Sequence, residues 1–370
     1  MSDPAVADRI ASWTAALCGI PGLSGYEDPV RAYVETTLTD AVIDRHLDAL
    51  GNLTLTVPGA DPAAPRVMVF AHTDQMGLIV RRIDHDGFLQ VERLGGVPDR
   101  VLPGLEMVVT NQDGRAIPCV VGIKAHHARP QDEKAQVQTH DRLRLDLGVD
   151  DAEAVRALGI DVGAPVTYRP GFRRLGPHRL CAPALDDRAG CAVLMELVRS
   201  AVAAPVPATL HAVFTVQEEF NLRGAMVAAQ RLRPDAAISL DIMVASDTPD
   251  LAERGSLRLG GGPALGMYSF HGRGTLNGTL PHPALLRHLC AAGEAAGIPL
   301  QRSAHSGLLT DASYVQLVGE GVPAIDLGYA TRYTHSPVEM CDLRDLAAMA
   351  TLLHAVLAGM PGGFSFARRS

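Results

Sequence analysis

Two kinds of apolar pattern alternate along most of this chain, and the alternation limits the folds that the chain can adopt. RVMVFAHTD (66–74) and ATLHAVFTVQ (208–217) contain continuous apolar runs without a helical period. Runs of this length that are rich in Val and Phe are typical of strands buried on both faces. DDRAGCAVLMELVRSAV (186–202) instead places apolar residues on one helical stripe. We therefore predict an α/β fold with a mixed, largely parallel sheet covered by helices on both faces.

The pattern changes between residues 75 and 176. Short β-like runs, such as GLIVRRI, GFLQVERL and EMVVT, are separated here by turn signals such as HDG and QDG. This behaviour predicts an inserted small all-β domain at 75–176, with the α/β domain formed by 1–74 and 177–370. The polar stretch 126–142 has no periodicity, and its two adjacent histidines have no ligand spacing, so we expect a surface loop.

Composition excludes several classes of protein. The chain has a net charge of -8 and a pI near 5.9, which argues against nucleic acid or an anionic membrane as the main partner. Its 6 cysteines form no C-x-x-C pair and are expected to be reduced thiols, which favours a cytoplasmic location. The first residues lack the basic start and apolar stretch of a signal peptide, and no segment approaches the roughly 18 apolar residues of a membrane helix.

Acidic residues and histidines gather where the predicted strands end. They are His72 and Asp74 in AHTD, Asp186 and Asp187 in ALDDRAG, Glu218 and Glu219 in QEEF, Asp241 in SLDIM, and His335 in RYTHSP. In α/β sheets the loops at these ends converge on one crevice. Each segment alone has an ordinary explanation as a local hydrogen-bonded pair, a helix cap, a turn or a loop. The prediction of a common site rests on all five segments occurring on one α/β frame.

This mixture of donors suits two divalent cations better than a thiolate site. Two imidazoles and several carboxylates are typical ligands of zinc, cobalt or manganese, and one carboxylate can bridge a pair of ions. Two ions close together can ionise a water and stabilise both oxygens of a displacement, while a nearby carboxylate takes the proton. The adjacent Glu218 and Glu219 fit that need, because one can bind metal while the other reaches the water.

The same segments resemble the signature segments of a known family. AHTDQMGLIV, ALDDRAGC, TVQEEFNLRGA, LDIMVASDTP and RYTHSPVEM are similar, in this order, to those of the cytosolic dinuclear metallo-aminopeptidases of the glutamyl and tetrahedral (TET) aminopeptidase family. Some members carry an endoglucanase label. The resemblance covers nearly the whole chain, including the β-rich insert and the stretch around Asp311. It implies a metal-dependent enzyme that removes N-terminal residues from peptides, with two divalent ions, Zn²⁺ first and Co²⁺ or Mn²⁺ as alternatives.

The resemblance also implies a metal ligand at each of five positions. Asp186 would bridge the two ions. His72 and Asp241 would complete the site of one ion, and Glu219 and His335 would complete that of the other.

Two further residues and the insert take roles from the same resemblance. Glu218 would be the general base that deprotonates the water and later delivers the proton to the leaving amine. Asp74 would fix the orientation of the His72 imidazole. The β-rich insert would mediate dimerisation, and the dimers would commonly assemble into a tetrahedral dodecamer.

At four positions this sequence differs from the residues that are most common in the family. Gln75 stands where an acidic residue is usual, Asp187 where Asn is common, and Phe220 and Asn221 where a Val-Gly pair is typical. None of the four is a ligand in the family pattern, so the chemistry should be retained. The local charge and the shape of the substrate pocket are expected to differ.

Other functions remain as alternatives. Related two-metal enzymes hydrolyse small N-acyl or N-carbamoyl amino acids, so a two-metal amidohydrolase is the runner-up. A metal-free binding protein would require the loss of a ligand, and none is lost. The endoglucanase label has little physical support, because Glu218 and Glu219 are neighbours, whereas glycosidase carboxylates face each other across a sugar.

Overall fold

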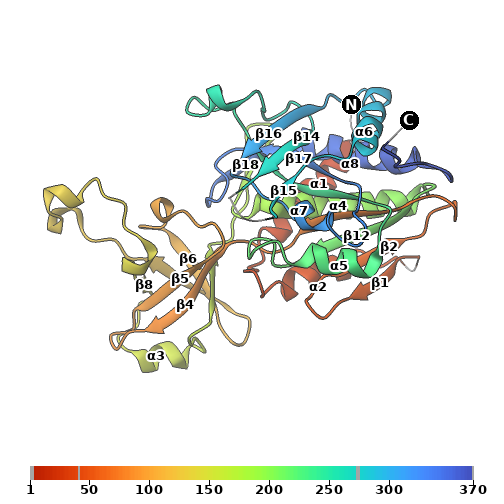
Figure 1. The fold of residues 1–370 in the computed structure, drawn as a ribbon. Helices are drawn as coiled ribbons and strands as arrows, with labels where there is room; N and C mark the ends of the chain where they lie inside the picture. Colours follow the sequence, from red (N-terminus) through yellow and green to blue (C-terminus); the bar gives the residue numbers. More distant parts are fainter. Residues whose placement is uncertain (1–3, 41, 272–275, 369–370) are drawn as a thin grey trace.

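The computed structural model describes residues 4–40, 42–271 and 276–368. An α/β body holds both ends of the described chain, and a smaller β-barrel extends from one side of it (Figure 1). Among the described residues, no helix is both long enough and apolar enough to cross a membrane.

The body is organised around a nine-stranded mixed sheet with the order β1-β2-β12-β3-β13-β17-β14-β15, in which β16 pairs with β14. The strands are β1 (Asp44–Leu47), β2 (Leu53–Val57), β3 (Arg66–His72), β12 (Thr209–Thr215), β13 (Ala236–Val244), β14 (Ala264–Phe270), β15 (Gly278–Thr279), β16 (Gln301–Ser306) and β17 (Ala324–Thr331). The central pairs β12–β3, β3–β13 and β13–β17 are parallel, and antiparallel pairs lie toward the edges. The predicted fold class is confirmed.

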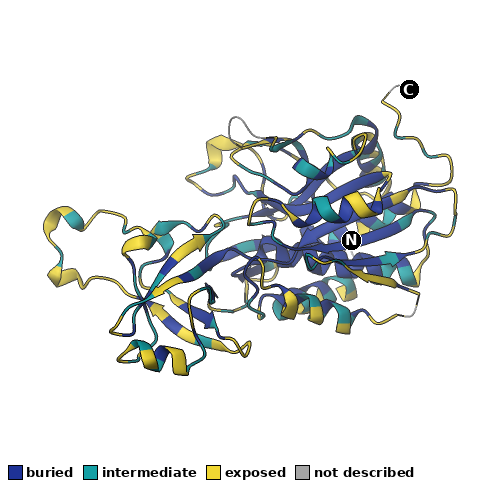
Figure 2. Ribbon diagram, turned by 60° about the horizontal axis from the view of Figure 1, so that its bottom comes forward, coloured by how far each residue is buried: buried dark blue, intermediate teal, exposed yellow. Residues whose placement is uncertain are grey.

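Helices cover both faces of this sheet, and the central strands between them are buried (Figure 2). The helices of the larger core are α1 (Pro4–Leu17), α2 (Asp28–Thr37), α4 (Leu185–Ala203), α6 (Pro283–Ala295) and α8 (Leu343–Ala358). The helices α5 (Gly224–Leu232) and α7 (Ala312–Val315) pack on the other face. A separate sheet of β10 (Arg173–Leu175), β11 (Arg179–Ala182) and β18 (Glu339–Asp342) lies beside the start of α4.

The side chains of β13 show how the sheet divides its residues between two environments. Ile238, Leu240 and Ile242 belong to the larger core. Because successive side chains of a strand point to opposite faces, Ser239 and Asp241 lie on the opposite face, on which the shorter α5 and α7 pack. The polar residues of the strand ends are therefore gathered on this partly covered face.

The β-rich segment forms a closed barrel with its own core, in the order β4-β5-β8-β7-β6-β9. Its strands are β4 (Gly77–Ile83), β5 (Leu89–Leu94), β6 (Glu106–Thr110), β7 (Ala116–Val121), β8 (Leu145–Asp146) and β9 (Pro165–Tyr168), with helix α3 (Ala152–Ala157) before β9. Residues 126–142 form short 3-10 turns in a polar loop that projects from the barrel away from the body (Figure 1). His126 and His127 are exposed in this loop.

Candidate metal centre

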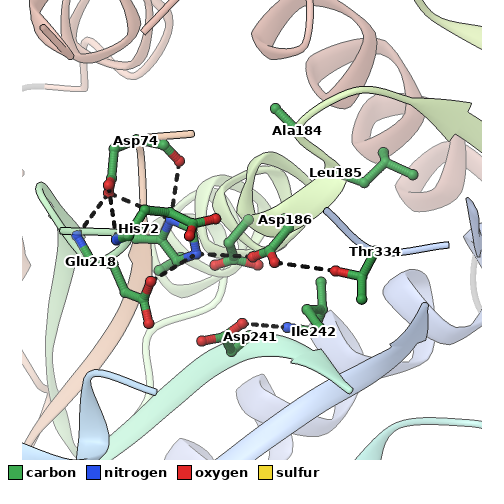
Figure 3. Close-up of polar contacts among 12 residues, drawn as sticks. His72, Asp74, Ala184, Leu185, Asp186, Glu218, Asp241, Ile242 and Thr334 are labelled. Atoms are coloured by element: carbon green, nitrogen blue, oxygen red, sulfur yellow. Dashed lines mark hydrogen bonds and ion pairs between the residues drawn. The ribbon is translucent and has the colours of Figure 1, made fainter. Parts of the chain in front are cut away.

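The strand order brings the predicted ligands to one edge of the sheet. His72 is the last residue of β3, Asp241 lies near the end of the adjacent β13, and Glu219 follows β12 on the other side of β3. Asp186 begins α4, and His335 follows β17. Figure 3 shows His72, Asp186 and Asp241 turned toward one another, with Glu218 beside them.

The ligand atoms form two groups that share one carboxylate. In the first group, atoms of His72, Asp186 and Asp241 all lie within 4.8 Å of one another. In the second, atoms of Asp186, Glu219 and His335 do so as well. Asp186 Oδ1 lies 3.0 Å from His72 Nε2, while its Oδ2 lies 3.6 Å from His335 Nε2. The two oxygens of Asp186 therefore face different groups, as a bridging carboxylate requires.

Both histidines present the same ring nitrogen to these groups. His72 Nδ1 lies 3.1 Å from the carbonyl oxygen of Asp74, and His335 Nδ1 lies 3.0 Å from that of Gly96. A carbonyl oxygen can only accept, so Nδ1 donates in each ring and Nε2 is the nitrogen that faces the carboxylates of the two groups. These contacts orient each ring so that Nε2 is the nitrogen that would bind a cation.

The electrostatics of the centre favour bound cations. Burial raises the pKa of Asp241 well above its usual range, and the nearby Asp186 adds to the effect. Burial likewise raises the pKa of Glu219 to about 7. Glu219 Oε1 is buried without a hydrogen bond, and its nearest ionic contact is His335 Nε2 at 3.8 Å. Buried carboxylates so close together require compensating positive charge, so the donor set fits divalent cations.

Asp74 connects His72 to the glutamate pair. Its carboxylate accepts hydrogen bonds from the backbone N–H groups of Glu218 and Glu219, both at 3.0 Å, and from Ser24 Oγ at 2.6 Å. Its Oδ1 lies 3.5 Å from His72 Nδ1. Burial alone would raise the pKa of Asp74, but the hydrogen bond from His72 and the other donors outweigh it and lower the pKa. An ionised Asp74 therefore holds the imidazole and the backbone of both glutamates.

Glu218 lies beside both groups without belonging to either. Its Oε2 is 3.9 Å from His72 Nε2, and its side chain lines a cavity of about 410 Å³ that opens onto the centre. Burial raises the pKa of Glu218 well above its usual range, against the influence of His72. A buried carboxylate at the cavity wall is suited to accept and return a proton.

A tight turn after β12 determines the directions in which the side chains of Glu218 and Glu219 point. Gln217, Asn221 and Leu222 have φ values of 57°, 68° and 56°, in the left-handed region. Asn is one of the few residues other than Gly that tolerates this conformation, so Asn221 suits the turn. Asn221 also lines the cavity. Phe220 is exposed, with the Arg223 guanidinium 5.3 Å from its ring centre.

Gln75 and Asp187, which the sequence analysis also singled out, are not part of the cavity lining. Gln75 is buried, and its backbone N–H donates to the carbonyl of Gly22 at 2.9 Å. Asp187 follows a cis peptide bond and places Oδ1 2.8 Å from the hydroxyl of Tyr329. Asp186 and Asp187 both have non-helical backbone angles, because α4 is kinked at these two residues.

Sequence reasoning gave no role to Glu339, which positions two of the predicted ligands. Glu339 Oε2 accepts from the backbone N–H of Asp186 at 3.0 Å, and Oε1 accepts from that of His335 at 2.7 Å. The signal was present in RYTHSPVEM, where Glu339 follows His335 by four residues. The barrel also contributes, because the hydroxyl of Tyr168 donates to the carbonyl of His335 at 3.2 Å.

Comparison with known proteins identifies relatives over almost the full length. The family model of the M42 glutamyl aminopeptidases matches residues 51–352. The putative aminopeptidase SgcX of Escherichia coli is 36% identical over 338 residues, which cover 91% of this chain and 90% of that protein. Two archaeal structures are similar throughout. Aminopeptidase APDkam598 from Desulfurococcus kamchatkensis has a TM-score of 0.89 and 33% identity, with 96% of each chain covered. The TET1 peptidase of Pyrococcus horikoshii, which can assemble into a tetrahedron or a large octahedral shell, has a TM-score of 0.82 and 26% identity, with 96% and 99% covered.

Proposed function

Because the chain belongs to the M42 glutamyl aminopeptidase family, we propose that it removes N-terminal residues from peptides at a centre that holds two divalent cations. The observation that carries this proposal is the placement of Asp186, whose two oxygens face separate ligand groups. A mononuclear site would have no use for a carboxylate shared in this way.

The residues that would hold the cations follow from the two groups. His72 and Asp241 would bind one ion, Glu219 and His335 would bind the other, and Asp186 would bind both. Imidazole and carboxylate donors suit Zn²⁺ first, with Co²⁺ or Mn²⁺ as alternatives. Bound there, the two cations would supply Lewis-acid polarisation of the scissile carbonyl and a lowered pKa for water in the site.

The protein's own side chains carry the proton transfers. Glu218 accepts the proton of the attacking water at its carboxylate and later delivers it to the leaving amine. Asp74 keeps Glu218 in place by accepting a hydrogen bond from its backbone N–H, and it orients His72 at the same time. Because the base is held through the backbone, its carboxylate stays free to turn between water and amine.

The direct test is hydrolysis after metal removal and reconstitution. The chelated protein would be loaded with Zn²⁺, Co²⁺ or Mn²⁺ and assayed on a panel of amino-acid p-nitroanilides and short peptides. We expect activity only after reloading, with stepwise release of N-terminal residues from the peptides. Hydrolysis of N-acyl or N-carbamoyl amino acids, with no activity on the panel, would replace this proposal with the two-metal amidohydrolase.

We further propose a homo-oligomer in which residues 75–176 form the dimerisation domain. The assembly of the Pyrococcus horikoshii TET1 peptidase supports a homo-oligomer, with a tetrahedral dodecamer as its larger form. On this chain, Val120 and Ile123 of the barrel are 47% and 54% exposed, which suits a surface that a partner covers. The cysteines are all free thiols in the structure, which supports the proposed cytoplasmic location.

A further inference from the structure

The cavity extends from the metal centre to a buried carboxylate that the proposed mechanism does not use. Asp326 lies in β17, and its partner in β13 is Ser239, two residues before Asp241. Paired residues of neighbouring strands, and residues two apart in one strand, face the same side of a sheet. Asp326 therefore lies on the same face of the sheet as Asp241. Standard strand spacing places their two α carbons about 8 Å from each other.

Asp326 has no cationic partner among the residues that the structure describes. Its side chain lines the cavity although the residue is only 3% exposed, and Thr310 Oγ1 donates to its Oδ1 at 2.6 Å. Burial raises the pKa of Asp326 to about 6, while hydroxyl groups, first that of Thr310, oppose the rise. No Lys, Arg or His in the described part of the chain forms an ion pair with it. At neutral pH the cavity therefore contains a negative charge that no described residue neutralises.

The neighbouring strand leaves this carboxylate accessible. Gly266 of β14 also lines the cavity, and a Cβ added there would lie 2.8 Å from Asp326 Cβ and 3.3 Å from its Oδ2. Any side chain at position 266 would therefore press on Asp326 or cover it. The absence of a side chain at this position opens a path from the cavity to the carboxylate.

The rest of the lining suits an apolar stem. Met243, Leu308 and Leu309 contribute to the walls, and the described lining includes no Lys or Arg. His305 also lines the cavity, but burial lowers its pKa and the charge of Arg254 adds to that effect. A negatively charged side chain that reached this part of the cavity would be repelled by Asp326.

We propose that this cavity receives the side chain of the substrate's N-terminal residue, that it selects lysine or arginine, and that Asp326 is the selecting residue. Lysine and arginine carry a cation at the end of a long apolar stem, which matches apolar walls that end at a carboxylate. The proposal rests on the aminopeptidase function proposed above and specifies its substrate class.

The test compares two substrates that differ only in the terminal charge. L-lysine p-nitroanilide and L-norleucine p-nitroanilide share a four-carbon stem, and norleucine lacks the ammonium group. We expect kcat/KM of the metal-loaded protein to favour lysine by about tenfold to a hundredfold, the range of a hydrogen bond between charged groups. Asp326→Asn, which keeps the shape of the side chain, should bring the ratio close to one. Because both substrates are assayed with the same protein preparation, losses in folding or metal loading cancel in the lysine-to-norleucine ratio of kcat/KM.

A positioning variant and a binding measurement complete the test. Thr310→Val removes the hydrogen bond to Asp326 and should raise KM for the lysine substrate more than it lowers kcat, and Thr310→Ser should restore KM. Calorimetry with free L-lysine and L-norleucine should show tighter binding of lysine to the native protein and no preference in Asp326→Asn.

The outcomes separate this inference from the proposed function. Hydrolysis of norleucine or glutamate p-nitroanilide as fast as the lysine substrate would overturn the selection while leaving the aminopeptidase intact. An unchanged lysine-to-norleucine ratio in Asp326→Asn would show that another group selects the substrate, and would reduce Asp326 to a strand-anchoring residue. Failure to hydrolyse any amino-acid substrate or peptide would overturn the proposed function, and the inference with it.

Discussion

At the scale of single residues, two neighbouring carboxylates of the centre occupy different positions and have different proposed roles. Glu218 and Glu219 are adjacent, yet Glu219 belongs to a ligand group while Glu218 stands outside both. The hydrogen bonds from their two backbone N–H groups to Asp74 keep the two side chains in these different positions. Each role can therefore be tested by changing one side chain and measuring chemistry and metal content separately.

Glu218→Gln should retain both metal ions and lose activity. The amide keeps the size of the side chain but cannot accept the proton, so we expect kcat to fall about 10²–10⁴-fold. Turnover of a p-nitroanilide and the metal content by mass spectrometry would be measured on the same sample. Glu320→Gln, at an exposed position, is the control and should behave as the native protein. Normal turnover in Glu218→Gln would rule out its role as the base.

Asp186→Ala should reduce binding of both ions, because its oxygens face both groups. Asp241→Ala removes a ligand from one group only and should leave about one equivalent of metal bound. Metal content after dialysis distinguishes the two variants, with the exposed Asp250→Ala as control. Two equivalents retained by Asp186→Ala would contradict the bridging role.

At the scale of secondary-structure elements, the sequence predicts what lies within an element better than what joins two elements. His72, Asp241 and Glu219 stood out because the apolar runs of their strands are visible in the sequence and these residues lie where the runs end. The contacts of Asp74 with the backbone after β12, and of Glu339 with Asp186, depend on how distant segments are brought together. No local pattern contains that information, because the strand order and the packing of α4 determine it.

Helices α1 and α4 are joined by a partly buried ion pair whose contribution to stability depends on pH. Glu196 accepts hydrogen bonds from Arg9 and Arg199 at 2.7–3.0 Å. Burial would raise the pKa of Glu196, but the two guanidinium groups outweigh it and lower the pKa below 4.5. A lowered folded-state pKa adds stability above the unfolded-state pKa, and that stability is lost as pH falls through the folded-state pKa.

Glu196→Gln should therefore destabilise the protein by about 1.5–3 kcal/mol at pH 7, the range for hydrogen bonds to charged groups. The difference from the native protein should shrink below a pH of about 4. Urea unfolding of both proteins at pH 7 and below a pH of about 4 measures this difference in the free energy of unfolding. Glu35→Gln breaks the more exposed pair with Arg31 and should cost less than about 0.5 kcal/mol. An equal loss at both pH values would show that packing, not charge, is responsible.

At the scale of the whole molecule, the barrel offers the surface on which assembly is proposed. Ile123→Glu places a charge at a position that is 54% exposed in the single chain, and burial of that charge would be costly. We expect light scattering after size exclusion to show a shift from dimer or larger species toward monomer. Leu317→Glu changes a similarly exposed residue of the body and should leave the dimer intact. An unchanged mass for Ile123→Glu would exclude this barrel surface as the interface.

The support that the barrel gives to His335 has a consequence for the evolution of the chain. Gly96 accepts a hydrogen bond from the imidazole, and a Cβ at Gly96 would lie 2.7 Å from that ring. Tyr168, at the other end of the barrel segment, holds the backbone of His335. The insertion is thus not an interchangeable module. Excision or replacement of it by another small domain would remove two supports of a ligand, so barrel and body are constrained to change together.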